Sequence, residues 1–132
     1  MNKSHKIIYW TSTILLALGM FSGGLMQALR TKETAQGILH LGYPIYFLSI
    51  LGTWKVLGVI AILLPKSPLL KEWAYAGFFF AMTGASISHI IMRDSFVESI
   101  GSFIFILLIV LSWSFRPENR KLMLAKPKKY EF

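Results

Sequence analysis

The sequence predicts an all-α integral membrane protein, a bundle of four membrane-spanning helices with both termini in the cytoplasm. Two observations predict this fold class. Of the 132 residues, 55% are hydrophobic and only 15% are charged, and four long apolar segments are separated by short polar connections. A helix needs about 20 apolar residues to cross the hydrocarbon core of a bilayer. A chain of this length therefore has room for a single domain, residues 1–132, made almost entirely of spans.

The first span is predicted over residues 7–29, a segment without any charged side chain. Lys3 and Lys6 precede it, which is also how a secretory signal peptide begins. The apolar run is longer than the roughly 7 to 15 residues of a signal-peptide core, and no small-residue cleavage site follows it. The segment is therefore interpreted as a membrane span.

The second and third spans each contain one ionisable side chain. Residues 43–64 form the second span, and Lys55 is its only charge. Pro44 falls in the first turn of this span, where its missing N–H costs little. Residues 73–92 form the third span, which carries His89 near its end.

The fourth span is predicted over residues 97–115 and ends before Pro117. Three connections join the spans: an outer loop over residues 30–42, a tight inner turn over 65–72 with two prolines, and a second outer loop over 93–96. This arrangement predicts neither a long linker nor a second domain.

Basic residues are distributed unequally between the two sides of the predicted bundle. The side of the termini holds ten: Lys3, Lys6, Lys66, Lys71, Arg116, Arg120, Lys121, Lys126, Lys128 and Lys129. The opposite side holds Arg30, Lys32 and Arg93. The positive-inside rule then places both termini in the cytoplasm, and we expect a multi-pass protein of a bacterial cytoplasmic membrane. A basic tail after a span is typical of contact with anionic membrane lipid, so the net charge of +8 does not indicate a nucleic-acid partner.

Lys55 is the residue of the sequence that most clearly indicates a site inside the bundle. A charged residue at the centre of a span costs about 2.5–3.5 kcal/mol on insertion scales. Lys55 lies roughly 13 Å from the cytoplasmic end of its span, and its own stem can recover about half of that by snorkelling. Two interpretations stay open: the ammonium snorkels to the membrane surface, or it lines a polar pocket inside the bundle and contacts a ligand.

The residues that could share such a pocket follow from depth along the spans. Counting residues along each span from its cytoplasmic end places residues 15–19, 81–84 and 106–108 level with Lys55. Thr83 is the residue among them that has a hydroxyl group. Further polar side chains follow toward the outer side. The predicted ligand-binding residues are Lys55, Thr83, Ser86, His89, Gln27, His40 and Ser49.

Two of these residues, His40 and His89, lie near the predicted outer ends of the spans. Imidazole can bind a metal or move a proton near neutral pH. A solvated rim, a site for a headgroup or quinone, and a haem or metal site are the alternatives. The haem and metal readings are disfavoured, because neither histidine has a ligand partner close in sequence. We expect His40 to lie at the rim and His89 in the cavity.

Two long sequence stretches resemble a known family. "LGYPIYFLSILGTWKVLGVIAIL", residues 41–63, and "LKEWAYAGFFFAMTGASISHI", residues 70–90, are similar to the DoxX-like family of small bacterial four-span membrane proteins. The G-x-x-K-x-x-G pattern around Lys55 is the most distinctive piece. The resemblance implies a four-helix membrane bundle with cytoplasmic termini. The name-giving relative is a membrane subunit of a thiosulfate:quinone oxidoreductase, and other branches of the wider group act as assembly factors for membrane receptors.

Two classes of function follow. The protein either binds a lipidic or quinone-like molecule, alone or as the membrane subunit of an electron-transfer complex, or it is a non-catalytic partner or assembly factor of another membrane protein. Glycines spaced as in Gly19–Gly23 are typical of close helix packing, within the bundle or in a homo-oligomer. The chain contains no cysteine, which excludes a dithiol mechanism within it. The sequence contains no nucleophile–base pair or phosphate-binding loop, so it assigns no catalytic residue.

Overall fold

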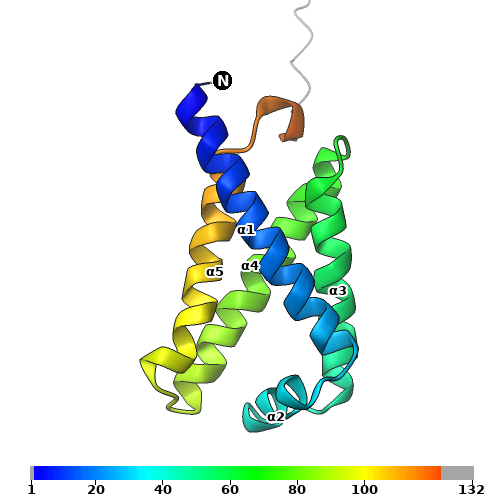
Figure 1. Ribbon diagram of the computed structural model, residues 1–132, viewed down its shortest axis with the longest axis vertical. Coiled ribbons are helices and arrows are strands. Elements are labelled where there is room, and N and C mark those ends of the chain that lie inside the picture. The colour runs from blue at the N-terminus through cyan, green and yellow to red at the C-terminus, as the bar shows by residue number, and fades with distance from the viewer. Residues whose placement is uncertain (1, 123–132) are drawn as a thin grey trace, which may run out of the picture.

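The computed structural model describes residues 2–122, and these residues form helices without any strand (Figure 1). The elements are α1 (Lys3–Ala28), α2 (Lys32–His40), α3 (Tyr46–Leu63), α4 (Pro68–Ile91), α5 (Phe96–Ser114) and the short 3₁₀ helix η1 (Glu118–Arg120). Four of them, α1, α3, α4 and α5, are long and apolar enough to cross a membrane. The predicted all-α fold with four spans is therefore confirmed.

Local sequence signals set the starts of the long helices. The Asn2 side chain accepts a hydrogen bond from the Ser4 amide at the start of α1. A capping box of Ser95 and Glu98 begins α5. Pro68 occupies the first turn of α4, where it has no amide to leave unpaired. Because α4 begins at Pro68, the expected inner turn is shorter than residues 65–72.

The outer connection after α1 contains a helix that the sequence analysis described as a loop. Thr31 caps α2, and its side chain accepts a hydrogen bond from the Thr34 amide. Backbone hydrogen bonds close the turns on both sides of α2, and Gly42 adopts a positive φ of 87° in the second connection. α2 is therefore a short helix lying across one end of the bundle (Figure 1).

The four long helices form a ring. α1 packs against α3 and α5, and α4 packs against the same two helices on the opposite side. Asn2 and η1 lie at one end of the bundle, hereafter the terminal end, and α2 and the turn between α4 and α5 lie at the other, hereafter the α2 end (Figure 1).

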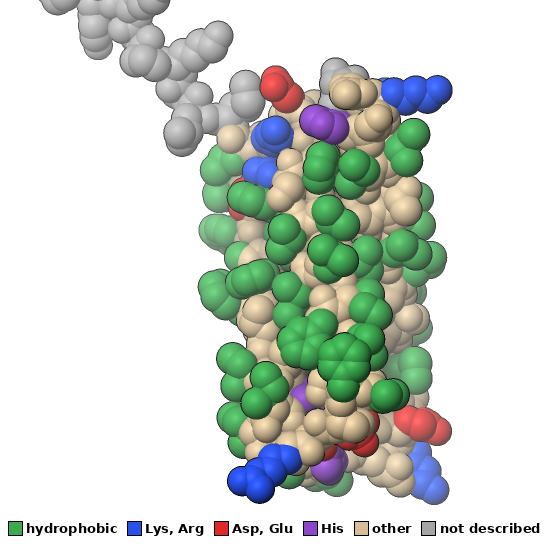
Figure 2. Space-filling view, turned by 90° about the vertical axis from the view of Figure 1, so that its left-hand side faces the viewer, with side chains coloured by type: hydrophobic (Ala, Val, Ile, Leu, Met, Phe, Trp, Pro, Cys, Tyr) green, Lys and Arg blue, Asp and Glu red, His purple; other side chains and the backbone are tan. Residues whose placement is uncertain are grey.

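The surface of the ring is apolar along its length. Large side chains on all four long helices are strongly exposed, among them Leu18, Trp54, Phe80 and Leu107. Figure 2 shows hydrophobic side chains over the middle of one face and charged side chains gathered at both ends. In water so much exposed apolar area would be unfavourable, whereas in a bilayer it faces hydrocarbon. The chain is a multi-pass integral membrane protein.

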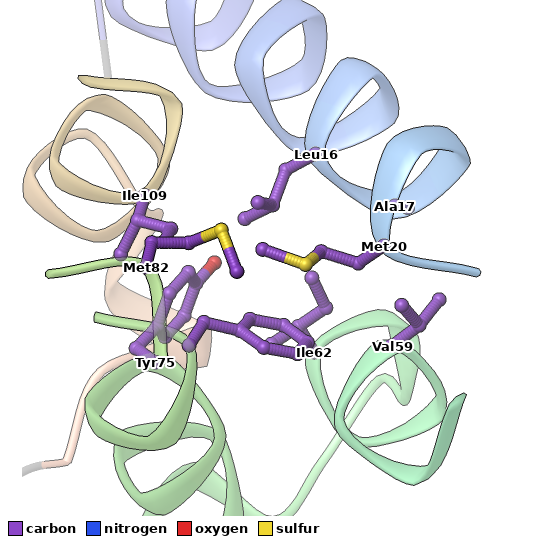
Figure 3. Packing of buried hydrophobic residues seen from close by; sticks show 9 residues of the cluster. Leu16, Ala17, Met20, Val59, Ile62, Tyr75, Met82 and Ile109 are labelled. Atoms are coloured by element: carbon purple, nitrogen blue, oxygen red, sulfur yellow. The ribbon is translucent and has the colours of Figure 1, made fainter. Parts of the chain in front are cut away.

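The core lies in the middle of the ring and takes side chains from all four long helices: Leu16, Ala17, Met20, Val59, Ile62, Tyr75, Phe78, Met82 and Ile109. Met20 and Met82 approach each other near its centre (Figure 3). Beside this core, the Ser112 hydroxyl lies 2.6 Å from Thr13 Oγ1 and 2.8 Å from the Tyr75 hydroxyl. These hydrogen bonds connect α5 to α1 and α4.

α1 and α3 make their closest approach where two glycines meet. A Cβ added at Gly52 would collide with the backbone of Gly24 and Ala28, and one added at Gly24 would lie 2.8 Å from the Cβ of Lys55. Lys55 is therefore level with Gly24, and the expectation that residues 15–19 lie beside it was wrong. α1 crosses the bundle obliquely (Figure 1), so two residues that lie the same number of positions from the terminal ends of α1 and α3 do not lie at the same depth.

Candidate functional site

A pocket of about 380 Å³ lies under α2 and is lined by residues of α1, α2, α3 and α4; we call it the α2-end pocket. Its lining residues are Gln27, Thr34, Gly37, Ile38, Leu41, Tyr43, Phe47, Leu48, Leu51, Lys55, Phe80, Ala81, Met82, Gly84, Ala85, Ser88 and His89. The inner face of α2 covers the pocket, and its Ile38 side chain is buried. Cavities of this size commonly hold small molecules in proteins.

Lys55 lies in the wall of this pocket, on the tenth residue of α3. Its side chain is buried, with 9% of the residue exposed. Across residues 2–122, no carboxylate, carbonyl or hydroxyl accepts a hydrogen bond from its ammonium. The ammonium is therefore held inside the bundle without a protein partner in the described part of the chain.

A second hollow meets the first at Lys55. It has a volume of about 390 Å³ and runs between α3 and α4; we call it the α3–α4 groove. Its lining is Phe47, Ile50, Leu51, Trp54, Lys55, Leu57, Gly58, Ala61, Leu70, Trp73, Ala74, Gly77, Phe78 and Ala81. Lys55 is the charged residue in this apolar lining. The two hollows share Phe47, Leu51, Lys55 and Ala81.

Polar residues from α1, α2, α3 and α4, and from the connection before α3, line the α2-end pocket. The Tyr43 hydroxyl lies 2.7 Å from Ser88 Oγ, and Ser88 donates to the Gly84 carbonyl at 2.8 Å. The buried Oε1 of Gln27 has no hydrogen-bond partner within residues 2–122. A buried acceptor without a donor is uncommon in folded proteins, and a bound molecule can supply one.

Asp94 joins the two histidines at the edge of the pocket. One carboxylate oxygen lies 2.7 Å from His40 Nε2 and the other lies 2.7 Å from His89 Nδ1. The Asp94 side chain is 6% exposed, whereas that of His40 is 53% exposed. We call this group the His40–Asp94–His89 clasp. It connects the end of α2 to α4 and to the turn before α5.

The clasp changes the protonation of the groups outside the spans. The hydrogen bond to Asp94, together with the charge of that carboxylate, raises the pKa of His40 above its ordinary value of 6.5. Hydrogen bonds from His89 and His40 lower the pKa of Asp94 below 3.8. Both shifts favour the charged pair. In the described part of the chain, no group of three His, Cys, Asp or Glu side chains is placed to hold a metal ion.

The structure separates the seven predicted ligand-binding residues. Lys55, Gln27 and His89 line the α2-end pocket, and His40 reaches its edge through Asp94. The other three are elsewhere, which corrects the sequence-based projection.

Each of these three side chains makes a hydrogen bond with another group of the protein. The Thr83 hydroxyl donates to the Phe79 carbonyl of its own helix at 2.8 Å. Ser86 donates to Ser102 Oγ at 2.8 Å and joins α4 to α5. Ser49 accepts a hydrogen bond from Arg30 Nε at 3.0 Å near the start of α3. Sequence depth was a poor guide here, because it leaves the rotation of each helix about its axis undetermined.

Sequence reasoning left Tyr43 and Asp94 out of the candidate list. Tyr43 lies at the start of the predicted second span, and its side chain lines the pocket. Asp94 follows His89 by five residues, just beyond the end of α4. A carboxylate so close to a helix-terminal histidine was the signal that could have identified it.

A second buried lysine lies at the terminal end. Lys71 is 1% exposed, and its ammonium donates hydrogen bonds to the carbonyls of Ala61, Leu64 and Lys66. Arg120 donates to the Ile62 carbonyl at 3.1 Å. These cations satisfy the carbonyls at the end of α3, which have no partner in their own helix. The sequence analysis had counted Lys71 only as a basic residue of the inner turn.

The comparison with known families identifies the chain. A family model described as DoxX-like matches residues 11–112, which cover most of the four spans and all the residues that line the two hollows. The chain belongs to the DoxX-like family. The resemblance found in the sequence is thereby confirmed. Neither the curated proteins nor the solved structures gave a match to this DoxX-like protein.

Proposed function

We propose that this DoxX-like protein binds a lipidic or quinone-like molecule in the α2-end pocket and holds its polar group at Lys55. The environment of Lys55 supports the proposal: the residue is only 9% exposed, it lines both hollows, and no group within residues 2–122 accepts a hydrogen bond from its ammonium. A charge at this depth costs about 2.5–3.5 kcal/mol on insertion scales. A charged side chain placed at such a cost, without a partner in the described residues, is expected at a functional site.

The walls of the pocket support an amphiphilic ligand. Gln27, Ser88 and His89 provide polar contacts on one side, and Ile38, Leu48 and Leu51 provide apolar contacts on the other. The carbonyl oxygen of a quinone-like ring could accept a hydrogen bond from Lys55. If the protein is the membrane subunit of an electron-transfer complex, the pocket is the quinone site and another subunit supplies the electrons.

The molecule that co-purifies with the protein tests this function. We would extract the detergent-purified protein with organic solvent and compare wild type, Lys55→Met and the matched surface variant Lys66→Met by mass spectrometry and absorbance. Wild type and Lys66→Met should release the same molecule in near-equal amount to protein, and Lys55→Met should release little of it. Equal retention by Lys55→Met would exclude Lys55 from the site.

A non-catalytic role as partner or assembly factor of another membrane protein is the second candidate. Gly23 on α1 and Gly101 on α5 have open space around the position of an added Cβ. Another helix could approach the backbone closely at such places, including a second copy of this chain. Bulky Gly23→Leu and Gly101→Leu variants should then lose the partner in cross-linking experiments, while Lys55→Met should retain it.

We also propose that both termini lie in the cytoplasm of a bacterial cell, because basic residues predominate at the terminal end. The chain has no cysteine, so single cysteines can be introduced at Lys121 and at Glu33. An impermeant thiol reagent should reach Glu33→Cys from outside the cell and Lys121→Cys only after permeabilisation. The basic residues expected to contact anionic lipid, Lys126, Lys128 and Lys129, lie outside the described residues.

A further inference from the structure

The α3–α4 groove gives the Lys55 site an opening toward the lipid. Trp54 and Trp73 line it and are each 66% exposed on the outer surface of the bundle. α3 and α4 also make sparser contacts than the other neighbouring pairs of long helices. A molecule dissolved in the bilayer can therefore reach Lys55 sideways, without passing through water.

The two glycines that line this groove have different surroundings. A Cβ added at Gly58 would lie 2.7 Å from the ring of Phe78, so that ring packs directly on the backbone of α3. Gly77, on the facing helix, has no atom within 4 Å of the position of an added Cβ. The groove is thus one slot between one pair of helices, with apolar walls and a cation at its junction with the α2-end pocket.

The charge at this junction is unbalanced. Neither hollow has an Asp or Glu among its lining residues, and the nearby Asp94 is engaged by His40 and His89. A neutral carbonyl would give the Lys55 ammonium a hydrogen bond and leave its charge uncompensated. An anion would give it the hydrogen bond and balance the charge, which favours an anion strongly where water is scarce.

We propose, building on the binding function above, that the ligand is a single-chain amphiphile with a carboxylate headgroup, a molecule of the fatty-acid class. Its carboxylate pairs with Lys55, and its chain lies in the α3–α4 groove. Lys55 lies midway along α3, about 12 Å from the end of that helix. The strongly hydrated glycerophosphate of a phospholipid stays at the membrane surface, whereas a carboxylate on a single chain can reach this depth.

Photolabelling with matched probes tests the headgroup. The probes are a 16-carbon carboxylic acid with a diazirine in its chain and the corresponding alcohol, each added to the full-length protein in detergent micelles. We expect the acid to label groove peptides about tenfold more than the alcohol, equivalent to about 1.4 kcal/mol. In Lys55→Met, labelling by the acid should fall to the level of the alcohol, and in Lys66→Met it should not change.

A second pair of variants tests the position of the chain. Gly77→Leu places a side chain in the groove without altering charge and should abolish labelling by both probes. Gly101→Leu makes the same change on α5, where the added Cβ also has open space, and should label as wild type does. Labelling that survives Gly77→Leu would overturn the placement of the chain.

Three outcomes separate this inference from the binding function itself. Equal labelling by acid and alcohol, lost together in Gly77→Leu, would overturn the anionic headgroup and leave lipid binding intact. Stronger labelling by a diacyl phosphatidic acid that carries the same diazirine chain would overturn the single-chain assignment. If no probe labels wild type more strongly than it labels Gly77→Leu, the inference is overturned, and the solvent extraction of the co-purified molecule decides the proposed function independently.

Discussion

The two buried lysines of this protein have opposite surroundings. At the terminal end, the Lys71 ammonium donates to three carbonyls around the end of α3. Midway along α3, Lys55 is also buried, but the described residues offer its ammonium no acceptor. Both lysines are buried, and the described residues supply hydrogen-bond acceptors to only one of the two ammonium groups.

This difference shows that burial of a charge does not by itself identify a functional residue. Lys71 closes the hydrogen bonds of a helix end, which explains its burial as a contribution to stability. Nothing in residues 2–122 explains Lys55 in this way. A count of hydrogen-bond partners therefore distinguishes a structural cation from a candidate binding cation. Four measurements test this distinction.

The largest expected effect is the loss of stability in Lys71→Met. The substitution removes three hydrogen bonds from a charged donor, and the buried one to the Ala61 carbonyl is among them, so we expect a loss of about 3 kcal/mol or more. Unfolding in detergent, followed by tryptophan fluorescence, measures it. The exposed Lys66→Met should change stability by no more than about 0.5 kcal/mol. A similarly small change in Lys71→Met would contradict its structural role.

Next in size is the effect of Gly52→Ala beside Lys55. The added methyl group meets the backbone of Gly24 and Ala28, so α1 and α3 must separate. Overpacking of this kind costs about 1–3 kcal/mol, and we expect about 2 kcal/mol in the same unfolding assay. Gly101→Ala is the matched control, since its methyl group enters open space. If Gly52→Ala were as stable as wild type, the close helix contact would be wrong.

Lys55→Met should have a smaller effect on stability, of the opposite sign. It removes an uncompensated buried charge at nearly constant side-chain length, so we expect unchanged stability or a gain of about 1 kcal/mol. Ligand retention should fall in the same preparation. A loss of stability as large as that expected for Lys71→Met would show that Lys55 is structural and would remove the contrast between the two lysines.

The smallest expected effect is a pH dependence of α2. The raised pKa of His40 gives a contribution that is complete below pH 6.5 and is lost as the pH rises through the shifted value. The lowered pKa of Asp94 gives one that is present above pH 3.8 and is lost as the pH falls through the shifted value. α2 should therefore be held most firmly between about pH 4 and 6.5.

A fluorine label on Gln36→Cys, on the exposed side of α2, reports this behaviour by NMR. The resonance should shift between pH 5 and 9 in the wild-type background. In His40→Asn the shift should be much smaller. An equal shift in both backgrounds would assign the change to a group outside the clasp.

Sequence reasoning predicted what depends on apolar length and missed what depends on helix rotation and tilt. The four spans follow from long apolar runs, because an apolar segment in lipid can pair all its backbone N–H and C=O groups within itself only by forming a helix. α2 was missed because nine residues with an internal Gly37 give no such run. The depth of Lys55 relative to α1 was misjudged because α1 lies obliquely in the bundle.

The candidate site was anticipated in part for the same reasons. A lone charge within an apolar run drew attention to Lys55, and a polar residue near a span end drew attention to Gln27 and His89. Thr83 and Ser86 looked equivalent in sequence, yet their hydroxyls bond within α4 or to α5. Lys71 lay close to a proline-rich turn, so its burial had no signature in the sequence.

The four-helix ring is joined unequally around its circumference. Direct contacts join α1 to α3 at Gly24 and Gly52, and hydroxyl pairs join α5 to α1 and to α4. The junction between α3 and α4 is bridged near the terminal end by the hydrogen bond from Lys71 to Ala61, and it contains the hollow that reaches Lys55. The area that the protein occupies in the plane of the membrane can therefore change most easily along that line. Lateral pressure from the surrounding acyl chains tends to close it, and a chain inserted there does mechanical work against the bilayer.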